Sequence, residues 1–355
     1  MSNVRSLNGN LDRRRFFGAA AIGAASSMLG SSVRASAEPI AVDSTPTLTG
    51  NGEWTYRKVE NWGHLPDGIA FGGTHGAIAT DNAGLVYVST QSNTGVLVYD
   101  SDGKLLKRIA TEFPEIHSMV LANEQGEDCF YTVVQKGTPQ QNWLFVKLKT
   151  DGTVMQKITA PAEAGFHAPN EWRITSAISG PDGSIFIANG YGDSRIFKFD
   201  KNGQYQTSFA GKGSVDGKCN CCHSLAVDIR YGQPLLLVCD RENRRLTHFD
   251  FDGRFVANIA HPLRRPCQVS FHGDYAVVSE LEGRVTILDK DNYPVAFLGD
   301  NPDKTQWANY KVSPEAILPT LFSAAHGCHI DHRGDIYISD WNQTGRVTKL
   351  VKERL

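Results

Sequence analysis

The sequence has no block of like charge. Its 36 basic residues nearly balance its 38 acidic ones, and neither sign is concentrated in one segment. We therefore predict no nucleic-acid partner, because proteins that bind phosphate backbones carry clustered positive charge. The sequence also lacks an apolar run of membrane-spanning length. The run at residues 18–30 is well short of the roughly 20 residues needed to cross a bilayer, so we predict no stable membrane anchor.

The N-terminal segment has the three parts of an export signal. Three arginines at positions 13–15 precede two phenylalanines and the apolar run, and Ala-Ser-Ala follows at 35–37 as a cleavage site. Consecutive arginines ahead of an apolar run are typical of the twin-arginine route. We predict a twin-arginine signal peptide at residues 1–37, the twin-arginine translocase as a partner during export, and a periplasmic or secreted location. Residues 38–52 are interpreted as a short linker.

A unit of four short β-strands recurs along the rest of the chain. A clear copy runs from Ser184 to Gly203, with two apolar strands, a polar loop between them and a closing Asn-Gly turn. Asp-Gly and Asn-Gly turns suit the positive φ values that tight hairpins require. Strands of the same kind are expected at residues 85–89, 96–100, 129–134, 144–148, 235–240, 245–250, 275–280, 284–289, 335–340 and 346–350. The period of about 40 to 50 residues is typical of β-propeller blades.

Six such units predict an all-β fold, a six-bladed β-propeller that occupies residues 53–355. The units begin near residues 70, 112, 170, 218, 263 and 321. The sixth unit lacks a fourth strand, whereas residues 53–60 can form a strand that has no unit of its own. We therefore expect the N-terminal strand to complete the last blade, because a closed ring leaves no exposed sheet edge.

Three histidines begin the predicted inner strands of alternate blades. Inner strands line the channel of a propeller, so His117, His223 and His326 are expected to converge on its axis. Blades three and five offer Thr175 and Gln268 at this position. Three imidazoles with an open side are the ligand arrangement of a catalytic zinc or related divalent site. We predict a divalent metal, and zinc is the metal we expect.

A fourth histidine, His75, lies near the start of the first blade. Its path to Asp81 is one residue longer than the matching path from His326 to Asp331. His75 could be a fourth ligand, a residue that orients a ligand, or a surface residue.

Two runs of sequence resemble the peptidyl-α-hydroxyglycine α-amidating lyases, within the wider class of NHL-repeat propellers. Residues 189–196, Asn-Gly-Tyr-Gly-Asp-Ser-Arg-Ile, are similar to that family's G-Y-x-N-S-R-I element. Residues 223–227 and 240–246 are similar to its H-S-L-A and D-R-E-N-x-R-I elements. Weaker similarity covers most of the chain after the signal.

The resemblance implies a metal-dependent carbon–nitrogen lyase. It implies that His117, His223 and His326 hold zinc, that Tyr191 is the general base, and that Arg241 lies in the substrate site. In that family a base takes the hydroxyl proton of an α-hydroxyglycine, and the C–N bond breaks to give a peptide amide and glyoxylate. From the residues alone, Tyr191 could also be an ordinary loop aromatic and Arg241 a salt-bridged residue between blades.

The sequence departs from the family pattern at three places. Thr90 stands where a second arginine is expected, so one contact to a substrate carboxylate is missing. Gly327 follows His326 where the family carries an aspartate linked to calcium, so we predict no calcium. Gly192 follows Tyr191, and the disulfide cysteines of the family are not matched. These departures predict altered substrate recognition.

The cysteines offer a competing interpretation. Residues 219–223 contain C-x-x-C-H, the attachment signature of c-type haem. We predict no haem, because covalent haem attachment needs an accessible chain outside the membrane, whereas twin-arginine export moves folded proteins. His223 also already belongs to the predicted set of metal-binding histidines. Cys222 and Cys328 could add thiolate ligands, form disulfides or simply pack, and at least one of the seven cysteines must lack a partner. Cys328 and His329 beside His326 leave a mixed-ligand copper or iron site open.

Two functions are compatible with the sequence. The first is a metal-dependent lyase that acts on a small-molecule or peptide substrate with a carboxylate. The second is a non-catalytic propeller that binds a peptide, glycan or protein partner and carries a structural metal. Three ligands with an open side favour the enzyme, because a structural zinc is normally closed by four ligands.

Overall fold

The computed structural model describes residues 47–353, except 74, 136–142, 260–261 and 344. The chain divides into two units, Met1–Asp43 and Ser44–Leu355, and every described residue belongs to the second. The predicted signal peptide therefore lies outside the described residues. Among the residues that are described, no helix has the length and apolar character needed to cross a bilayer.

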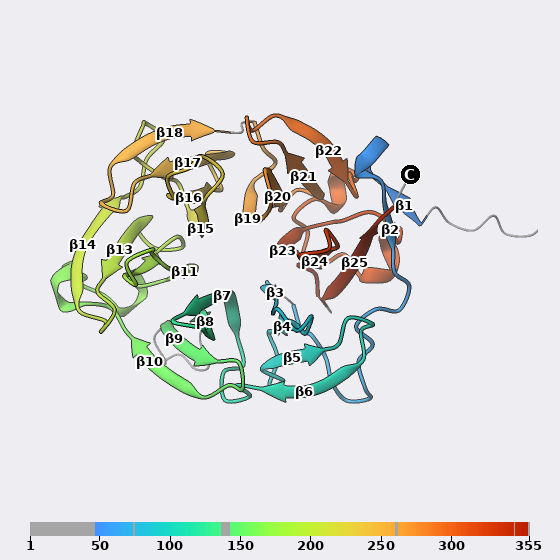
Figure 1. The fold of residues 1–355 in the computed structure, drawn as a ribbon, viewed down its shortest axis with the longest axis horizontal. Helices are drawn as coiled ribbons and strands as arrows, with labels where there is room; N and C mark the ends of the chain where they lie inside the picture. Colours follow the sequence, from blue (N-terminus) through green and yellow to red (C-terminus); the bar gives the residue numbers. More distant parts are fainter. Residues whose placement is uncertain (1–46, 74, 136–142, 260–261, 344, 354–355) are drawn as a thin grey trace, which may run out of the picture. The chain divides into compact units, whose positions relative to one another are not determined.

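Six antiparallel sheets are arranged in a ring about one axis, which confirms the predicted six-bladed β-propeller (Figure 1). We number the blades in chain order. Blades 1 to 3 comprise β3 (Ile78–Thr80), β4 (Val86–Ser89), β5 (Val96–Tyr99) and β6 (Leu105–Ile109); β7 (Ile116–Glu124), β8 (Glu127–Val134), β9 (Leu144–Lys149) and β10 (Val154–Ile158); and β11 (Ser176–Ser179), β12 (Ile185–Ala188), β13 (Arg195–Phe199) and β14 (Tyr205–Ala210). Blades 4 to 6 comprise β15 (Cys222–Asp228), β16 (Leu235–Asp240), β17 (Arg245–Phe249) and β18 (Phe255–Ile259); β19 (Pro266–His272), β20 (Tyr275–Glu280), β21 (Arg284–Leu288) and β22 (Pro294–Leu298); and β23 (Ala325–Ile330), β24 (Ile336–Asp340) and β25 (Arg346–Lys352).

The last blade is closed by the N-terminal segment, as predicted. β2 (Tyr56–Lys58) pairs antiparallel with β25, so the start and the end of the propeller share one sheet. β1 (Leu48–Thr49) adds a fifth, outermost strand, and it lies within the range that we interpreted as a linker. A strand of two residues has no sequence period, which is why the pattern did not indicate it.

The hydrophobic core lies between neighbouring blades. Tyr87 of blade 1 packs edge-to-face on Phe130 of blade 2, with ring centroids 4.9 Å apart. Middle strands such as β12 are buried at every position because each blade is covered on both faces. This burial explains why these strands are continuous apolar runs rather than alternating ones.

The hairpin turns follow from the aspartates that end the third strands. The Asp200 carboxylate accepts hydrogen bonds from the backbone N–H groups of Asn202 and Gln204, at 2.9 and 2.8 Å. Gly203 then adopts a φ of 84°, which a residue with a Cβ rarely does. Asp250 makes the same pair of bonds in blade 4, to Asp252 and Arg254.

The inner strands β7, β19 and β23 share an irregularity that positions the site. The pairing register of the first and second strands shifts between Ile116 and Ser118, between Pro266 and Gln268, and between Ala325 and Gly327. The residue inside each shift is left out of the ladder. Such bulges re-aim a side chain, and here they mark the residues that meet at the axis.

Candidate metal centre and active site

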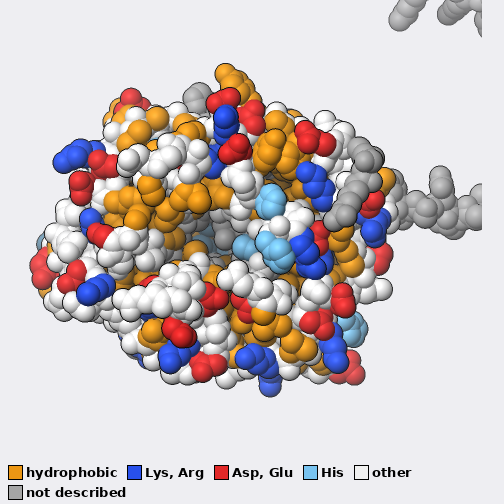
Figure 2. All heavy atoms as spheres, viewed as in Figure 1, with side chains coloured by type: hydrophobic (Ala, Val, Ile, Leu, Met, Phe, Trp, Pro, Cys, Tyr) orange, Lys and Arg blue, Asp and Glu red, His pale blue; other side chains and the backbone are white. Residues whose placement is uncertain are grey.

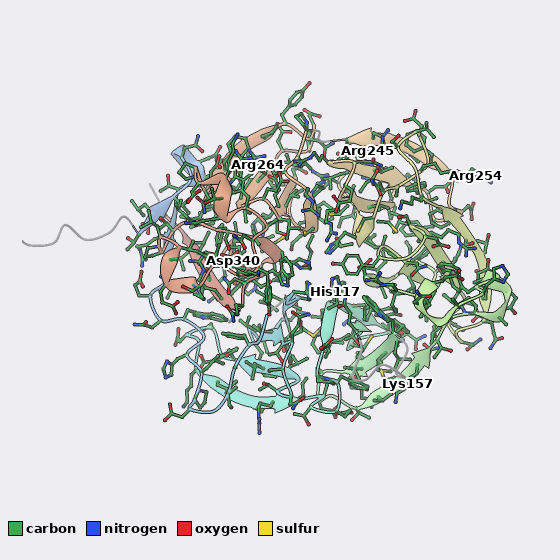
Figure 3. The ribbon with its side chains drawn as sticks, turned by 180° about the vertical axis from the view of Figure 1, so that it is seen from behind. His117, Lys157, Arg245, Arg254, Arg264 and Asp340 are labelled. Atoms are coloured by element: carbon green, nitrogen blue, oxygen red, sulfur yellow. The ribbon has the colours of Figure 1, made fainter. Side chains whose placement is uncertain are left out.

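Four histidine side chains gather at the axis. The ring centroids of His117, His223 and His326 lie 4.7–5.3 Å apart, although the residues come from blades 2, 4 and 6. His75, which precedes β3, lies 4.9 Å from both His117 and His326 and stacks on Trp341. His117 is labelled at the inner end of its blade in Figure 3. The three predicted ligands therefore do converge, and His75 lies beside them.

Backbone carbonyls orient two of these imidazoles. His117 Nδ1 lies 2.7 Å from the carbonyl oxygen of Thr175, and His223 Nδ1 lies 2.8 Å from that of Cys267. Because a carbonyl only accepts, each Nδ1 must carry the proton, and each Nε2 keeps a free lone pair. This tautomer, fixed by a hydrogen bond at the other nitrogen, is the usual one for metal-binding histidine.

The nitrogen atoms that face the axis are short of hydrogen-bond donors. His326 Nε2 is buried and has no hydrogen-bond partner among the described residues. The Tyr191 hydroxyl lies 3.1 Å from Nε2 of both His117 and His223, but its single proton can satisfy only one of them. Buried polar atoms without partners are costly. A cation beside His326 would satisfy such nitrogens, because its donor atom lies within 4.8 Å of those of His75 and His117 in one group and of those of His223 and Cys267 in another. The residues therefore fit a metal ion, although the structure does not bring the donor atoms of His117 and His223 into one such group.

Burial keeps the four imidazoles neutral. It lowers the pKa of His117 to about 3, with Arg241 adding to the effect and the bond to Thr175 opposing it. Burial likewise lowers the pKa of His75, His223 and His326 well below the usual value of histidine. Neutral imidazole is the form that binds metal ions.

Two groups of three donor atoms lie within 4.8 Å of one another among the described residues. One comprises His75, His117 and His326, and the other comprises His223, Cys267 and His326. His326 belongs to both. Cys267 was not anticipated, because the strand start was placed at Gln268 and the bulge puts the preceding residue at the axis. The sequence does contain a pattern that could have indicated Cys267. Each residue that the bulges turn towards the axis is followed by a small or polar residue, and Gln268 follows Cys267.

Cys222 and Cys328 pack in cores of the propeller. Cys222 Sγ contacts the carbonyl oxygen of Arg195 and packs in the core between blades 3 and 4, together with Cys219. Cys328 Sγ contacts the carbonyl oxygens of Gln268 and Val277 in another core. All seven cysteines are unpaired and buried. The geometry thus places Cys222 and Cys328, two of the three accessory candidates, of which the third is His75, in packing positions.

Tyr191 and Arg241 lie next to the imidazoles. Arg241 Nη1 donates to the Tyr191 hydroxyl over 3.3 Å, and its guanidinium lies 5.2 Å from the centre of the Tyr191 ring. Burial raises the pKa of the Tyr191 phenol, and the positive charge of Arg241 opposes that rise. Arg241 is thus both a salt-bridged residue, through Glu242 at 2.9 Å, and a partner of Tyr191.

The loop between β12 and β13 holds Tyr191 in place. The Asn189 side chain accepts from the Arg173 backbone N–H and donates to the Glu171 carbonyl oxygen and the Asp193 carboxylate. Gly192 follows, and a Cβ at that position would lie 2.3 Å from the same Glu171 oxygen. The loop therefore requires glycine after Tyr191, which explains one departure from the family pattern.

A cavity of about 460 Å³ opens above the histidines. It is lined by His75, Gln135, Trp143, Arg173, Tyr191, Arg241, Arg265, Leu281, Ala308, His326 and Trp341. Figure 2 shows the centre of one face of the propeller hollowed, with histidine side chains beside the hollow. Thr90 does not line the cavity, since its hydroxyl is buried and donates to the carbonyl oxygen of Gly95.

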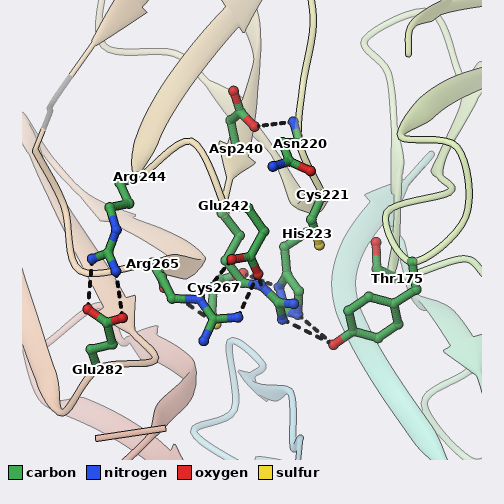
Figure 4. Close-up of polar contacts among 12 residues, drawn as sticks. Thr175, Asn220, Cys221, His223, Asp240, Glu242, Arg244, Arg265, Cys267 and Glu282 are labelled. Carbon is green, nitrogen blue, oxygen red and sulfur yellow. Dashed lines mark hydrogen bonds and ion pairs between the residues drawn. The ribbon is translucent and has the colours of Figure 1, made fainter. Parts of the chain in front are cut away.

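Glu242 links two of the arginines around this cavity. Its carboxylate accepts from Arg241 Nε and from both Nε and Nη2 of Arg265, at 2.6–3.0 Å (Figure 4). One negative charge is therefore shared by two positive ones.

Comparison with known proteins relates the chain to amidating enzymes. It is 34% identical over 174 residues to peptidyl-glycine alpha-amidating monooxygenase of Mus musculus. The matched segment covers 46% of this chain and 16% of the mouse protein. The chain thus corresponds to a small part of the curated relative. No family model matches it.

Solved structures share the fold at low sequence identity. A streptogramin B lyase superposes with a TM-score of 0.55 at 13% identity, covering 85% of this chain and 100% of that one. A virginiamycin B lyase from Staphylococcus aureus superposes with a TM-score of 0.51 at 14% identity, covering 80% and 97%. The chain is an NHL-like six-bladed propeller. Its partial homology is to the peptidylglycine amidating enzymes.

Proposed function

We propose that this protein is a metal-dependent lyase that cleaves the C–N bond of an α-hydroxy amide. The observation that carries the proposal is the Tyr191 hydroxyl, 3.1 Å from two imidazole nitrogens and bonded to Arg241. A proton acceptor, a cation and neutral imidazole nitrogens thus lie side by side, and Tyr191, Arg241 and His326 line the same cavity. The matched segment of an amidating enzyme supports the same chemistry.

His117, His223 and His326, whose ring centroids lie 4.7–5.3 Å apart, would hold the metal. His75 and Cys267 are further donors, since each belongs to a group of three donor atoms that includes His326. Nitrogen and sulfur donors suit zinc among the common divalent ions. When bound, such an ion supplies Lewis acidity that lowers the pKa of a substrate hydroxyl.

The residues of the chain then move one proton. Tyr191 accepts the hydroxyl proton at its oxygen in the phenolate form. Burial disfavours this form, and the Arg241 guanidinium stabilises it through its charge and the bond from Nη1. The hydroxyl oxygen forms a carbonyl, the C–N bond breaks, and the amide nitrogen takes the proton back from Tyr191. The products are an amide and an aldehyde such as glyoxylate. Arg241 also holds the substrate carboxylate by charge-assisted hydrogen bonds.

Glyoxylate release tests this function. We expect the protein to release glyoxylate from N-acyl-α-hydroxyglycines, and a chelator to abolish the release. Tyr191→Phe should lower the rate by about 100-fold or more with the metal retained, because only the proton acceptor is lost. Tyr293→Phe, at a tyrosine 71% exposed, is the matched control and should change nothing.

A panel of acyl groups is needed, because Thr90 in place of the family arginine predicts weak binding of ordinary family substrates. A fully metallated protein that cleaves no member of the panel, yet binds a peptide or glycan at the cavity, would contradict the lyase and support the binding module.

We also propose that the protein is exported by the twin-arginine translocase and acts in the periplasm or outside the cell. The arginines at 13–15 and the cleavage site at 35–37 support this proposal.

A further inference from the structure

The cavity above the histidines carries an excess of positive charge. Three arginines, Arg173, Arg241 and Arg265, are among its lining residues, and no described lining residue is acidic. The one nearby carboxylate that pairs with them, Glu242, is shared between Arg241 and Arg265. Positive charge therefore remains in excess over the paired carboxylate, and a ligand of the opposite sign would balance it.

Arg173 is the cavity arginine that has no carboxylate partner among the described residues. Its guanidinium lies over the rings of Trp143 and Tyr191, at 5.5 and 5.9 Å from their centres. In the part of the chain that the structure describes, its side chain, which is exposed, has no hydrogen-bond or ion-pair partner. The aromatic contacts hold the planar cation at the cavity wall without using its N–H donors.

Arg173 and Arg241 stand beside the same aromatic ring. Their guanidinium carbons lie 5.9 and 5.2 Å from the centre of the Tyr191 ring. A ligand that places one anionic group against Arg241, next to the imidazoles, can therefore bring a second anionic group to Arg173. No described lining residue other than Arg173, Arg241 and Arg265 carries a positive charge.

We propose that the substrate is a dianion, with one carboxylate at Arg241 and a second anionic group at Arg173. This inference rests on the proposed function, because it describes the substrate of that same site. Arg173 is then the residue that sets specificity, and it selects for a charged group remote from the reacting carbon. The arrangement differs from a site in which two arginines hold one carboxylate.

Binding of two four-carbon acids tests the proposal without turnover. Succinate and butyrate differ by one carboxylate, and the tryptophans at the cavity, Trp143 and Trp341, supply a fluorescence signal. We expect metal-loaded protein to bind succinate about 10-fold or more tighter than butyrate, as one added charge-assisted contact predicts. Arg173→Gln should remove this preference and leave butyrate binding unchanged.

Two variants act as controls. Arg254→Gln removes the same charge from a side chain 77% exposed on β18's hairpin and should keep the preference. Arg173→Lys keeps the charge and should keep part of the preference. Equal affinities for the two acids in the unchanged protein, or an unchanged preference in Arg173→Gln, would overturn the proposal. A protein that prefers succinate but cleaves no member of the panel of α-hydroxy amides would sustain the binding of a dianion at this site and contradict the lyase.

Discussion

Each oriented histidine depends on the backbone of the blade that follows it. His117 of blade 2 donates to the Thr175 carbonyl of blade 3, and His223 of blade 4 donates to the Cys267 carbonyl of blade 5. The blades that lack a histidine therefore contribute a carbonyl that fixes the tautomer of their neighbour. Along blades 2 to 5, a histidine thus alternates with the carbonyl that orients it.

Burial of neutral histidines predicts an acid-sensitive fold in the metal-free protein. The folded pKa of His117 is about 3, below the value near 6.5 expected in the unfolded chain. The unfolded state therefore takes up protons first, and the free energy of unfolding falls as the pH drops from about 6.5 towards 3. His117→Gln should reduce this slope by about 1.4 kcal/mol per pH unit.

Urea denaturation between pH 4 and 7 in the presence of a chelator measures the slope. His167→Gln, at an exposed position, serves as the control and should match the unchanged protein. Equal slopes for His117→Gln and the unchanged protein would show that His117 is not held neutral.

Residues of the site differ in how far the sequence could predict them. His117, His223 and His326 share a residue type and a two-blade spacing, so the fold's symmetry identified them. Cys267 is a cysteine, not a histidine, so the shared residue type does not reveal it. Only the bulge in β19 shows that Cys267, and not Gln268, faces the axis. Arg173 and Arg265 lie two residues before ring residues on blades 3 and 5, in loops whose side-chain directions no period indicates.

Strands and turns were more predictable than their registers. Apolar runs and Asp-Gly or Asn-Gly turns located the middle strands because burial on both faces and positive φ values constrain residue type directly. A bulge is a shift in the pairing register between two strands, so the sequence of one strand alone does not predict it. The same reason explains β1, which exists only through its pairing with β2.

Closure of the ring depends on β2, and Tyr56 tests its contribution. Its side chain is fully buried among residues of blades 5 and 6, and its hydroxyl has no partner among the described residues. Tyr56→Ala should lower the free energy of unfolding by about 3–5 kcal/mol, as for other large aromatic residues in cores. Tyr56→Phe should cost less than about 0.5 kcal/mol, because no described hydrogen bond is lost.

Chemical denaturation of the two variants separates packing from hydrogen bonding. A large loss in Tyr56→Phe would mean that the hydroxyl is bonded. A small loss in Tyr56→Ala would mean that the N-terminal strand adds little to closure.

At the scale of the whole molecule, the closed ring is what creates the site. Residues from 75 to 326 meet at one axis only because six blades complete a circle, and the last blade needs the N-terminal strand. Repeat counting predicted this circle, and with it the meeting of the histidines. The charge of the cavity could not be predicted in the same way. It depends on the ion pairs that the Glu242 carboxylate forms with both Arg241 and Arg265, which come from different blades.

Metal analysis of protein purified without added histidines tests the central claim most directly. We predict about one divalent ion, zinc in the first instance, per chain. His326→Ala should lose most of it, because His326 belongs to both donor groups. His167→Ala should retain it. A folded, unaltered protein that holds no metal after incubation with zinc, or a His326→Ala variant with a full complement, would contradict the account.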